Sequence, residues 1–378
     1  MMRIFICILA IGLSSCSDVV YNNDNLHSVV INNNEETVAD TTLFSDKLTV
    51  KLETNDRSII GDVDKVMLSD TTIYIKDRRQ KKIAFFGLSG KFVGSIQSIG
   101  KGHGEYIDLC DFTIDRSAKE LLLLVYPYGI MHYTLDGKFK YKEELDKIYT
   151  DIACDDSYYY LRNETYANLK QAEYSLAIID KKTGKKTEML KLDNEYAPFC
   201  SFGQRIYDNG RIFFTRFFDP TIYELTDGKA VPAYSMDFGK HTFPEEKMKK
   251  QFDCSELFSM SQKESYIYAM SKLKVGQKYM IFSSNLFDLN VFDTGTGDCT
   301  HYDKFKDIEL DNNWPSFLPV DGTTDKVCVV LAARMFESAK NIVEKYPELR
   351  NKFSDKMIEM SQTSNKNDNP TLLIYSLK

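Results

Sequence analysis

The chain has 378 residues, of which 43% are hydrophobic and 27% are charged, and its formal net charge is −7. This is the composition of a globular protein with enough apolar residues to bury a core. The acidic balance gives no basic surface for nucleic acid, so we expect no nucleic-acid partner. The 24 Phe and 23 Tyr residues, against one Trp, are typical of β-strands and favour a sheet protein.

The first fifteen residues, MMRIFICILAIGLSS, have the pattern of an export signal. Arg3 precedes an apolar run over residues 4–13, which is too short to span a bilayer as a mature helix. The following LSSC, residues 13–16, resembles the bacterial lipobox, whose cysteine becomes the lipid-modified first residue. We therefore predict a signal peptide over residues 1–15 and a lipid on Cys16 as the only membrane attachment. The alternative is an ordinary signal peptide followed by an incidental cysteine.

Residues 17–40, SDVVYNNDNLHSVVINNNEETVAD, are rich in Asn and acidic residues and show little periodicity. Such a composition predicts a flexible tether over residues 16–40 that holds a folded domain, residues 41–378, away from the membrane. The first strand signal is LTVKL at residues 48–52, where apolar and polar residues alternate.

A turn of the Gly-Lys type follows an apolar run again and again along the domain. These turns contain Gly90, Gly137, Gly184, Gly228 and, more loosely, Gly295, in steps of 47, 47, 44 and 67 residues. A fixed period of this length is typical of β-propeller blades. The long step contains residues 240–264, where Pro244 and two glutamates predict the start of a helix. Without these 25 residues the step is 42, so we interpret them as a helical insertion.

Two strand-like runs precede each turn, and both are rich in β-branched and aromatic residues. The earlier runs are Thr72–Ile75, Glu120–Val125, Ser157–Leu161, Arg211–Phe214, Lys278–Phe282 and Lys326–Leu331. The later runs are Ile83–Phe86, Gly129–Thr134, Tyr174–Ile179, Thr221–Leu225, Leu286–Phe292 and Leu372–Tyr375. The sixth repeat is interrupted by residues 332–362, where apolar residues spaced three and four apart predict a second helical insertion.

The last predicted strand, residues 372–375, has no outer partner after it in the sequence. The strand at residues 48–52 is available from the amino-terminal side. Pairing the two would close a ring and remove open sheet edges, which invite aggregation.

Several of these motifs together resemble one family. The glycine loop GKGHGEY at residues 100–106, the Gly-Lys turns, the lipobox and the ending DNPTLLIY at residues 368–375 resemble six-bladed β-propeller lipoproteins of Bacteroides-type bacteria, which are related to NHL-repeat propellers. The resemblance covers about residues 48–378. It implies an all-β fold, a six-bladed β-propeller with small helical insertions whose ring is closed by the N- and C-terminal strands. His103 stands where the family usually has Pro.

The glycine loop could cradle a phosphate, but no Ser or Thr follows its Gly-Lys and a strand, not a helix, comes next. His103, Glu105, Asp108 and Asp111 could be read as a metal site, yet residues this close on one strand or loop cannot all converge on one ion. We expect an exposed structural loop. Only His103 and Glu105 are kept as ligand-binding candidates.

The histidines, at positions 27, 103, 132, 241 and 301, have no HExxH or other metal-binding spacing, and no Gly-x-Ser-x-Gly motif is present in the sequence. We therefore predict neither catalytic nor metal-binding residues. Six cysteines remain after Cys7 and Cys16, and their wide scatter predicts mostly free thiols. They are Cys110, Cys154, Cys200, Cys254, Cys299 and Cys328.

Polar and aromatic residues near strand ends are the other candidates for a binding face, because loops of a propeller converge at the ends of its channel. Each could equally pack between blades or lie in a solvated turn. These candidates are Arg162, Arg216, Asp219, Tyr266 and Trp314, with Asn163 beside the first.

The predicted function is that of an exported, lipid-anchored binding module at the cell envelope, on the periplasmic or surface face of the outer membrane. Its ligand is expected to be a protein, a peptide or a glycan, and no cofactor is predicted. One alternative is a hydrolase or lyase that holds calcium in the central channel. Another is a structural component of an envelope complex.

Overall fold

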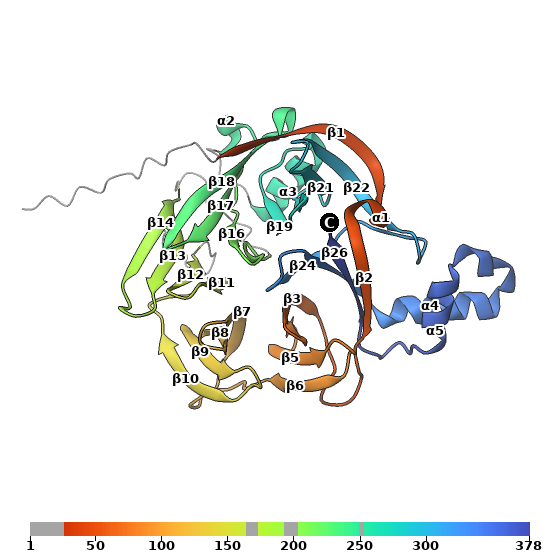
Figure 1. Cartoon of the computed structure of the whole chain (residues 1–378), viewed down its shortest axis with the longest axis horizontal. Helices are drawn as coiled ribbons and strands as arrows, with labels where there is room; N and C mark the ends of the chain where they lie inside the picture. Colours follow the sequence, from red (N-terminus) through yellow and green to blue (C-terminus); the bar gives the residue numbers. More distant parts are fainter. Residues whose placement is uncertain (1–25, 164–172, 193–202, 249–252) are drawn as a thin grey trace, which may run out of the picture.

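The structure is a computed structural model that describes residues 26–163, 173–192, 203–248 and 253–378. It is mostly β: hydrogen bonds join its strands into four sheets, which surround the centre of the molecule in Figure 1. None of the helices in the described residues is both long enough and apolar enough to cross a bilayer.

Two sheets are small and antiparallel, with four strands each. The first contains β7 (Asp108–Asp115), β8 (Glu120–Tyr126), β9 (Gly129–Thr134) and β10 (Phe139–Glu144). The second contains β11 (Ile152–Cys154), β12 (Tyr158–Arg162), β13 (Tyr174–Asp180) and β14 (Lys186–Lys191).

The third sheet has eight strands and unites the two ends of the described chain. Its strands are β2 (Phe44–Lys51), β26 (Thr371–Leu377), β25 (Lys326–Leu331), β24 (Leu318–Asp321), β3 (Val63–Ser69), β4 (Thr72–Asp77), β5 (Lys82–Gly87) and β6 (Phe92–Ile96). β2 and β26 pair antiparallel, from Phe44 opposite Leu377 to Lys51 opposite Thr371. The pairing expected between residues 48–52 and 372–375 is therefore present.

The fourth sheet has ten strands. Along its path lie β15 (Ile206–Asp208), β16 (Ile212–Phe214), β17 (Thr221–Thr226), β18 (Lys229–Asp237), β1 (His27–Ala39), β22 (Cys299–Asp307), β21 (Leu289–Asp293), β20 (Tyr279–Ser284) and β19 (Met270–Val275). β23 (Asn312–Trp314) pairs with β22. β1 runs parallel to both of its neighbours and joins β18 to β22 (Figure 1).

All twelve strand runs predicted from the sequence are strands in the structure, with small differences at their ends. The largest difference is in β21, which begins at Leu289 and not at Leu286. Alternating or continuous burial of β-branched and aromatic residues explains this agreement, because each run has at least one face in the core.

The predicted fold class, a six-bladed β-propeller, is nevertheless wrong. It requires six separate four-stranded blades, whereas the strands are joined into four sheets of ten, eight, four and four strands. Three parallel pairings produce the larger sheets. β24 pairs with β3, where Val320 is opposite Val66, and β1 pairs with both β18 and β22. Pairing between strands so far apart in the sequence leaves no periodic signal.

The predicted tether over residues 16–40 is also wrong in its second half. His27–Ala39 is the strand β1, which buries Val29 and Val38 completely or nearly so. The Asn-rich sequence between them conceals the strand because Ile31 to Asn33 carries a register shift, so the apolar residues do not alternate regularly.

Helices occupy both predicted insertions. The first contains the 3₁₀ turn η3 (Gly239–His241), α2 (Glu245–Met248) and α3 (Cys254–Glu264), and the second contains α4 (Ala333–Lys345), η4 (Pro347–Lys352) and α5 (Asp355–Gln362). A one-turn helix, α1 (Asp40–Leu43), links β1 to β2. α3 begins with a capping box of Asp253 and Glu256. α4 and α5 project away from the sheets (Figure 1).

Candidate ligand-binding pocket

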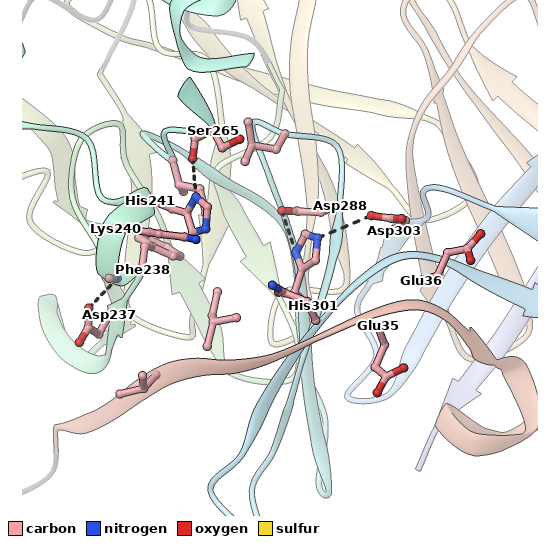
Figure 2. Close-up of a pocket in the computed structure, with 16 residues that line it drawn as sticks. Glu35, Glu36, Asp237, Phe238, Lys240, His241, Ser265, Asp288, His301 and Asp303 are labelled. Carbon is pink, nitrogen blue, oxygen red and sulfur yellow. Dashed lines mark hydrogen bonds and ion pairs between the residues drawn. The ribbon is translucent and has the colours of Figure 1, made fainter. Parts of the chain in front are cut away.

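A pocket of about 590 Å³ lies where β1 crosses between β18 and β22, next to the loop that follows α3. Its floor is apolar, formed by Ile31, Phe238, Ile267 and Leu286 with Val30 at the rim. Its polar lining gathers two histidines and several carboxylates from segments far apart in the sequence (Figure 2). The pocket exists because residues 27–39 are a strand; a mobile tether there would leave it without one wall.

His301, on β22, stands between two carboxylates. Its Nδ1 lies 3.5 Å from Asp288 Oδ2 and its Nε2 lies 3.7 Å from Asp303 Oδ1. These distances are longer than ordinary hydrogen bonds, so neither carboxylate makes a tight contact with the imidazole. A quarter of the His301 side chain is exposed, which leaves it accessible from the pocket.

Of the two carboxylates beside His301, Asp288 is the one held in place by hydrogen bonds. It is 3% exposed, and it accepts hydrogen bonds from Ser284 N at 2.6 Å, Ser284 Oγ at 2.7 Å and Asn290 Nδ2 at 3.0 Å. Three donors compensate the burial of a carboxylate. Asp288 therefore holds His301 from below and has little capacity left for a ligand.

His241 faces the same pocket from the first helical insertion. Its Nδ1 lies 3.0 Å from the carbonyl oxygen of Ser265, which can only accept, so Nδ1 carries the proton and donates. In the neutral ring, Nε2 is then an acceptor. The backbone of His241 is fixed as well, because its carbonyl accepts from Ile267 N at 2.7 Å.

The charge of the lining is strongly one-sided. The lining includes five carboxylates, from Glu35, Glu36, Asp237, Asp288 and Asp303, and one lysine, Lys240. Two of these carboxylates, Glu36 and Asp303, have side chains that are 79% and 65% exposed and lie on the same side of β1 in Figure 2. Glu36 has only a surface ion pair with Lys304 at 3.0 Å, which is a weak interaction. The pocket can therefore attract a positive group and pack apolar atoms beneath it.

A metal site is not formed by these residues. Across residues 26–163, 173–192, 203–248 and 253–378, no group of three or more His, Cys, Asp or Glu side chains is arranged to hold a metal ion. In the pocket, the two carboxylates lie beside His301 alone, whereas His241 is bonded to the carbonyl oxygen of Ser265 (Figure 2).

A second set of charged residues lies in the interior, between β3, β7 and β24. Lys65 Nζ is 3.0 Å from Asp111 Oδ1, 3.3 Å from Asp321 Oδ2 and 2.8 Å from the carbonyl oxygen of Phe112. Burial alone lowers the pKa of Lys65, but the two carboxylates outweigh it and raise the pKa above the ordinary value. The ammonium group of Lys65 therefore occupies the space between these two carboxylates, where a bound cation would otherwise lie.

Another interior cation, Lys274, donates its hydrogen bonds to neutral acceptors. Its Nζ donates to Asn209 Oδ1 at 3.0 Å and to the carbonyl oxygens of Val320 at 2.9 Å and Thr323 at 2.6 Å. Burial lowers the pKa of Lys274 to about 8, and burial also raises the pKa of Asp321 to about 6. The interior charges therefore bind one another and the backbone.

His103 and Glu105 lie together in the glycine loop, which lines a different pocket of about 550 Å³. Glu105 Oε2 accepts from Gly102 N at 2.7 Å, so the loop's anion site is occupied by the loop's own carboxylate. A Cβ at Gly100 would lie 1.9 Å from the same oxygen, so any larger residue there would displace the Glu105 carboxylate. His103 packs edge-on against Phe139, with ring centroids 5.5 Å apart.

Arg162 is completely buried and donates to Asp151 Oδ2 at 3.2 Å, and Asn163 beside it donates to the carbonyl oxygen of Tyr174 at 3.1 Å. Arg216 donates to Asp219 Oδ2 at 2.6 Å. These contacts bind the four residues to one another and to neighbouring segments of the chain.

Tyr266 lies beside the aromatic cluster at the base of the first insertion, 5.8 Å from the ring of Phe243 and 4.6 Å from Lys247 Nζ. Trp314 is 7% exposed and packs in the core. Cys16 lies outside the described residues. Cys110, Cys154, Cys299 and Cys328 are free, as predicted for most cysteines, whereas Cys200 lies outside the described residues.

Sequence reasoning missed the histidines and carboxylates of the pocket beside β1. His241 and His301 were considered only for metal spacing, and the two exposed carboxylates lie in unremarkable polar runs. The one usable signal was Val29 to Ile31, an apolar run inside the supposed tether, which indicates burial against something.

Comparison with known proteins finds one matching family model and several similar solved structures. The match to a family model described as a domain of unknown function, DUF4934, spans residues 25–376. A crystal structure from Bacteroides fragilis NCTC 9343, of a protein expected to be exported, has a TM-score of 0.74 at 20% identity, over 93% of this chain and 99% of that one. A member of the DUF4221 family from Bacteroides vulgatus ATCC 8482 has a TM-score of 0.52 at 8% identity, over 89% of this chain and 97% of that one.

At these identities the likeness to the solved structures shows the fold alone, and the predicted membership of a propeller lipoprotein family is not confirmed by them. A search among curated proteins finds no match. The family model, in contrast, covers nearly the whole described chain, and the protein therefore belongs to the DUF4934 family.

Proposed function

We propose that this protein is an exported, lipid-anchored binding protein of the cell envelope, and that the pocket beside β1 is its ligand site. The ligand class that fits is a cationic group on an apolar body, such as a basic side chain of a peptide. One observation carries this proposal: five carboxylates and one lysine surround an apolar floor.

Export and anchoring are supported by the amino-terminal sequence. A short apolar run after Arg3 and the LSSC motif at residues 13–16 have the pattern of a lipoprotein signal. The similar protein from Bacteroides fragilis is itself described as expected to be exported. The outer membrane is the proposed place of the anchor.

The physical basis for cation binding is that the carboxylates of the pocket differ in their exposure and in their internal hydrogen bonds. Asp288 is buried and already satisfied, so it serves to hold His301. Asp303 and Glu36 are exposed, so a ligand can approach them without breaking a strong internal bond. A guanidinium or ammonium group there gains charge-assisted hydrogen bonds, while its apolar neighbours cover the floor.

Titration calorimetry with two matched peptides tests the ligand class. One peptide has a central arginine between leucines, and the other has citrulline, the neutral isostere, in its place. We expect the arginine peptide to bind about tenfold more tightly, which corresponds to one charge contact of roughly 1.4 kcal/mol. Equal affinities for the two peptides would contradict the proposal.

Two variants locate the binding. Asp303→Asn combined with Glu36→Gln should weaken the arginine peptide by about tenfold and leave the citrulline peptide unchanged. The matched control is Asp298→Asn, an exposed carboxylate just before β22 that does not line the pocket. Loss of binding in the control would show that net charge, and not the pocket, attracts the peptide.

The anchor has a separate test. Cells that express the chain and receive a labelled fatty acid should label the protein, and Cys16→Ser should abolish the label. Labelling that survives Cys16→Ser would contradict lipidation at this residue.

A further inference from the structure

Two aromatic side chains beside the pocket are exposed to solvent and in contact with each other. Phe287 is 65% exposed, Phe258 is 42% exposed, and their ring centroids are 6.0 Å apart. Phe258 belongs to α3, and Phe287 lies in the turn between β20 and β21. Its neighbours in the chain, Leu286 and Asp288, both line the pocket beside β1.

The fold gains nothing obvious from exposing Phe287 in this way. Its φ is +61°, a left-handed conformation that a bulky side chain rarely adopts. Exposure of a phenyl ring to water is unfavourable as well. Two such costs at one position are typical of functional sites.

The turn that carries Phe287 is held rigidly. The side chain of Asn285 accepts from Tyr268 N at 2.8 Å and from Ala269 N at 3.2 Å. Gln262 Nε2, on α3, donates to the carbonyl oxygen of Asn285 at 3.1 Å, which ties the helix of Phe258 to the turn of Phe287. The pair is therefore presented as a fixed apolar surface.

The position of the chain's amino-terminal part indicates what covers this surface. Cys16 and His27, the first residue of β1, are separated by eleven residues, which cannot span more than about 40 Å in any conformation. A compact protein of this length has a diameter of about 50 Å. A lipid on Cys16 would hold the edge at β1 near the bilayer, while the opposite edge at β6 would lie a molecular diameter away (Figure 1).

We propose that Phe258 and Phe287 insert into the surface of the lipid bilayer, so that the molecule docks with the pocket edge toward the membrane. This inference rests on the lipid anchor of the proposed function. Glu36 and Asp303 of the neighbouring pocket determine which lipid surface is favoured. Their carboxylates attract the ammonium of zwitterionic headgroups and repel anionic headgroups.

The test uses two tryptophan probes in the mature lipidated protein, reconstituted into vesicles of phosphatidylethanolamine and phosphatidylcholine with brominated acyl chains. Phe287→Trp places the probe at the proposed contact, and Val93→Trp, on β6, is the control at a site that is 63% exposed. The native Trp314 is buried and contributes equally to both proteins. Neither substitution disturbs the core, since both sites are exposed.

We expect the Phe287→Trp probe to shift to shorter wavelength and to be quenched about threefold more strongly than the Val93→Trp probe. Replacing phosphatidylethanolamine by phosphatidylglycerol should reduce this difference. Vesicle-bound protein with equal quenching of the two probes would overturn docking and leave the anchor intact. Protein that does not float with the vesicles at all would overturn the anchor and the docking with it.

Discussion

The interior cluster around Lys65 and the pocket beside β1 contain the same kinds of side chain, yet they differ in what those side chains bind. In the interior, Lys65 lies within 3.3 Å of both Asp111 and Asp321, and no charge faces solvent. In the pocket, Asp303 and Glu36 are mostly exposed and held by weak or distant partners. The interior charges stabilise the contact between the sheets, whereas the exposed carboxylates of the pocket remain available to a ligand.

The difference shows that residue type alone does not identify a site. The sequence predicts a binding face at the ends of a propeller channel, and calcium held inside that channel is one alternative. The interior carboxylates are present, but the ammonium of Lys65 fills the place between two of them. Carboxylates that are exposed beside an apolar floor are the better indication of ligand binding.

Removing the interior cation should have the largest effect. Lys65→Met leaves Asp111 and Asp321 buried without their cation, and we expect a loss of about 3–5 kcal/mol in the free energy of unfolding by denaturant. The control is Lys263→Met, whose side chain is 82% exposed and which should change stability by less than about 0.5 kcal/mol. A similar, small effect of both substitutions would mean that the interior cluster does not stabilise the fold.

Lys274 should make the free energy of unfolding depend on pH. Its folded pKa of about 8 lies below the ordinary value of 10.5, so between these values the unfolded chain retains a proton that the folded chain has lost. Stability therefore rises with pH in this window, by about 2 kcal/mol from pH 8 to 9.5 if this lysine acts alone. Lys274→Met should remove that rise in denaturant unfolding. An unchanged pH profile in the variant would assign the rise to other groups.

The glycine loop resembles the interior cluster, because the carboxylate of Glu105 is already bound within the loop. Gly100→Ala should displace Glu105 from Gly102 N and cost about 1 kcal/mol, the value of one hydrogen bond. In a Glu105→Ala background the same substitution should cost clearly less. Equal costs in both backgrounds would show that Glu105 is not the reason for glycine at position 100.

The pocket should show the smallest effect on stability. Asp303→Asn with Glu36→Gln removes exposed carboxylates, so the free energy of unfolding should change by less than about 0.5 kcal/mol. The same variant is expected to lose binding of the arginine peptide. A large loss of stability would place these carboxylates with the structural charges of the interior.

Local sequence patterns predicted much of the secondary structure. The strand runs from Thr72 onward were identified because each alternates or continues its apolar residues over a buried face. The strand at residues 48–52 was paired correctly with the end of the chain, because both lacked a partner. The helical insertions were visible from Pro244 and from the spacing of apolar residues in 332–362.

The arrangement of the sheets and the pocket could not be predicted in the same way. β1 and the β24 to β3 pairing are parallel contacts between distant segments, and register in such pairs is set by tertiary structure. β1 forms one wall of the pocket. Because its residues were predicted to be a tether, the pocket could not be predicted either. The charge of Asp303 in the sequence is no different from that of Asp298, and only the structure distinguishes them.

A crystal structure of the protein with the arginine peptide tests the central claim most directly. The guanidinium should lie within hydrogen-bond distance of Asp303 and Glu36, with the leucines over Ile31 and Leu286 and with the Lys65 cluster unchanged. A peptide bound elsewhere on the molecule, or the arginine turned away from both carboxylates, would contradict the assignment of this pocket.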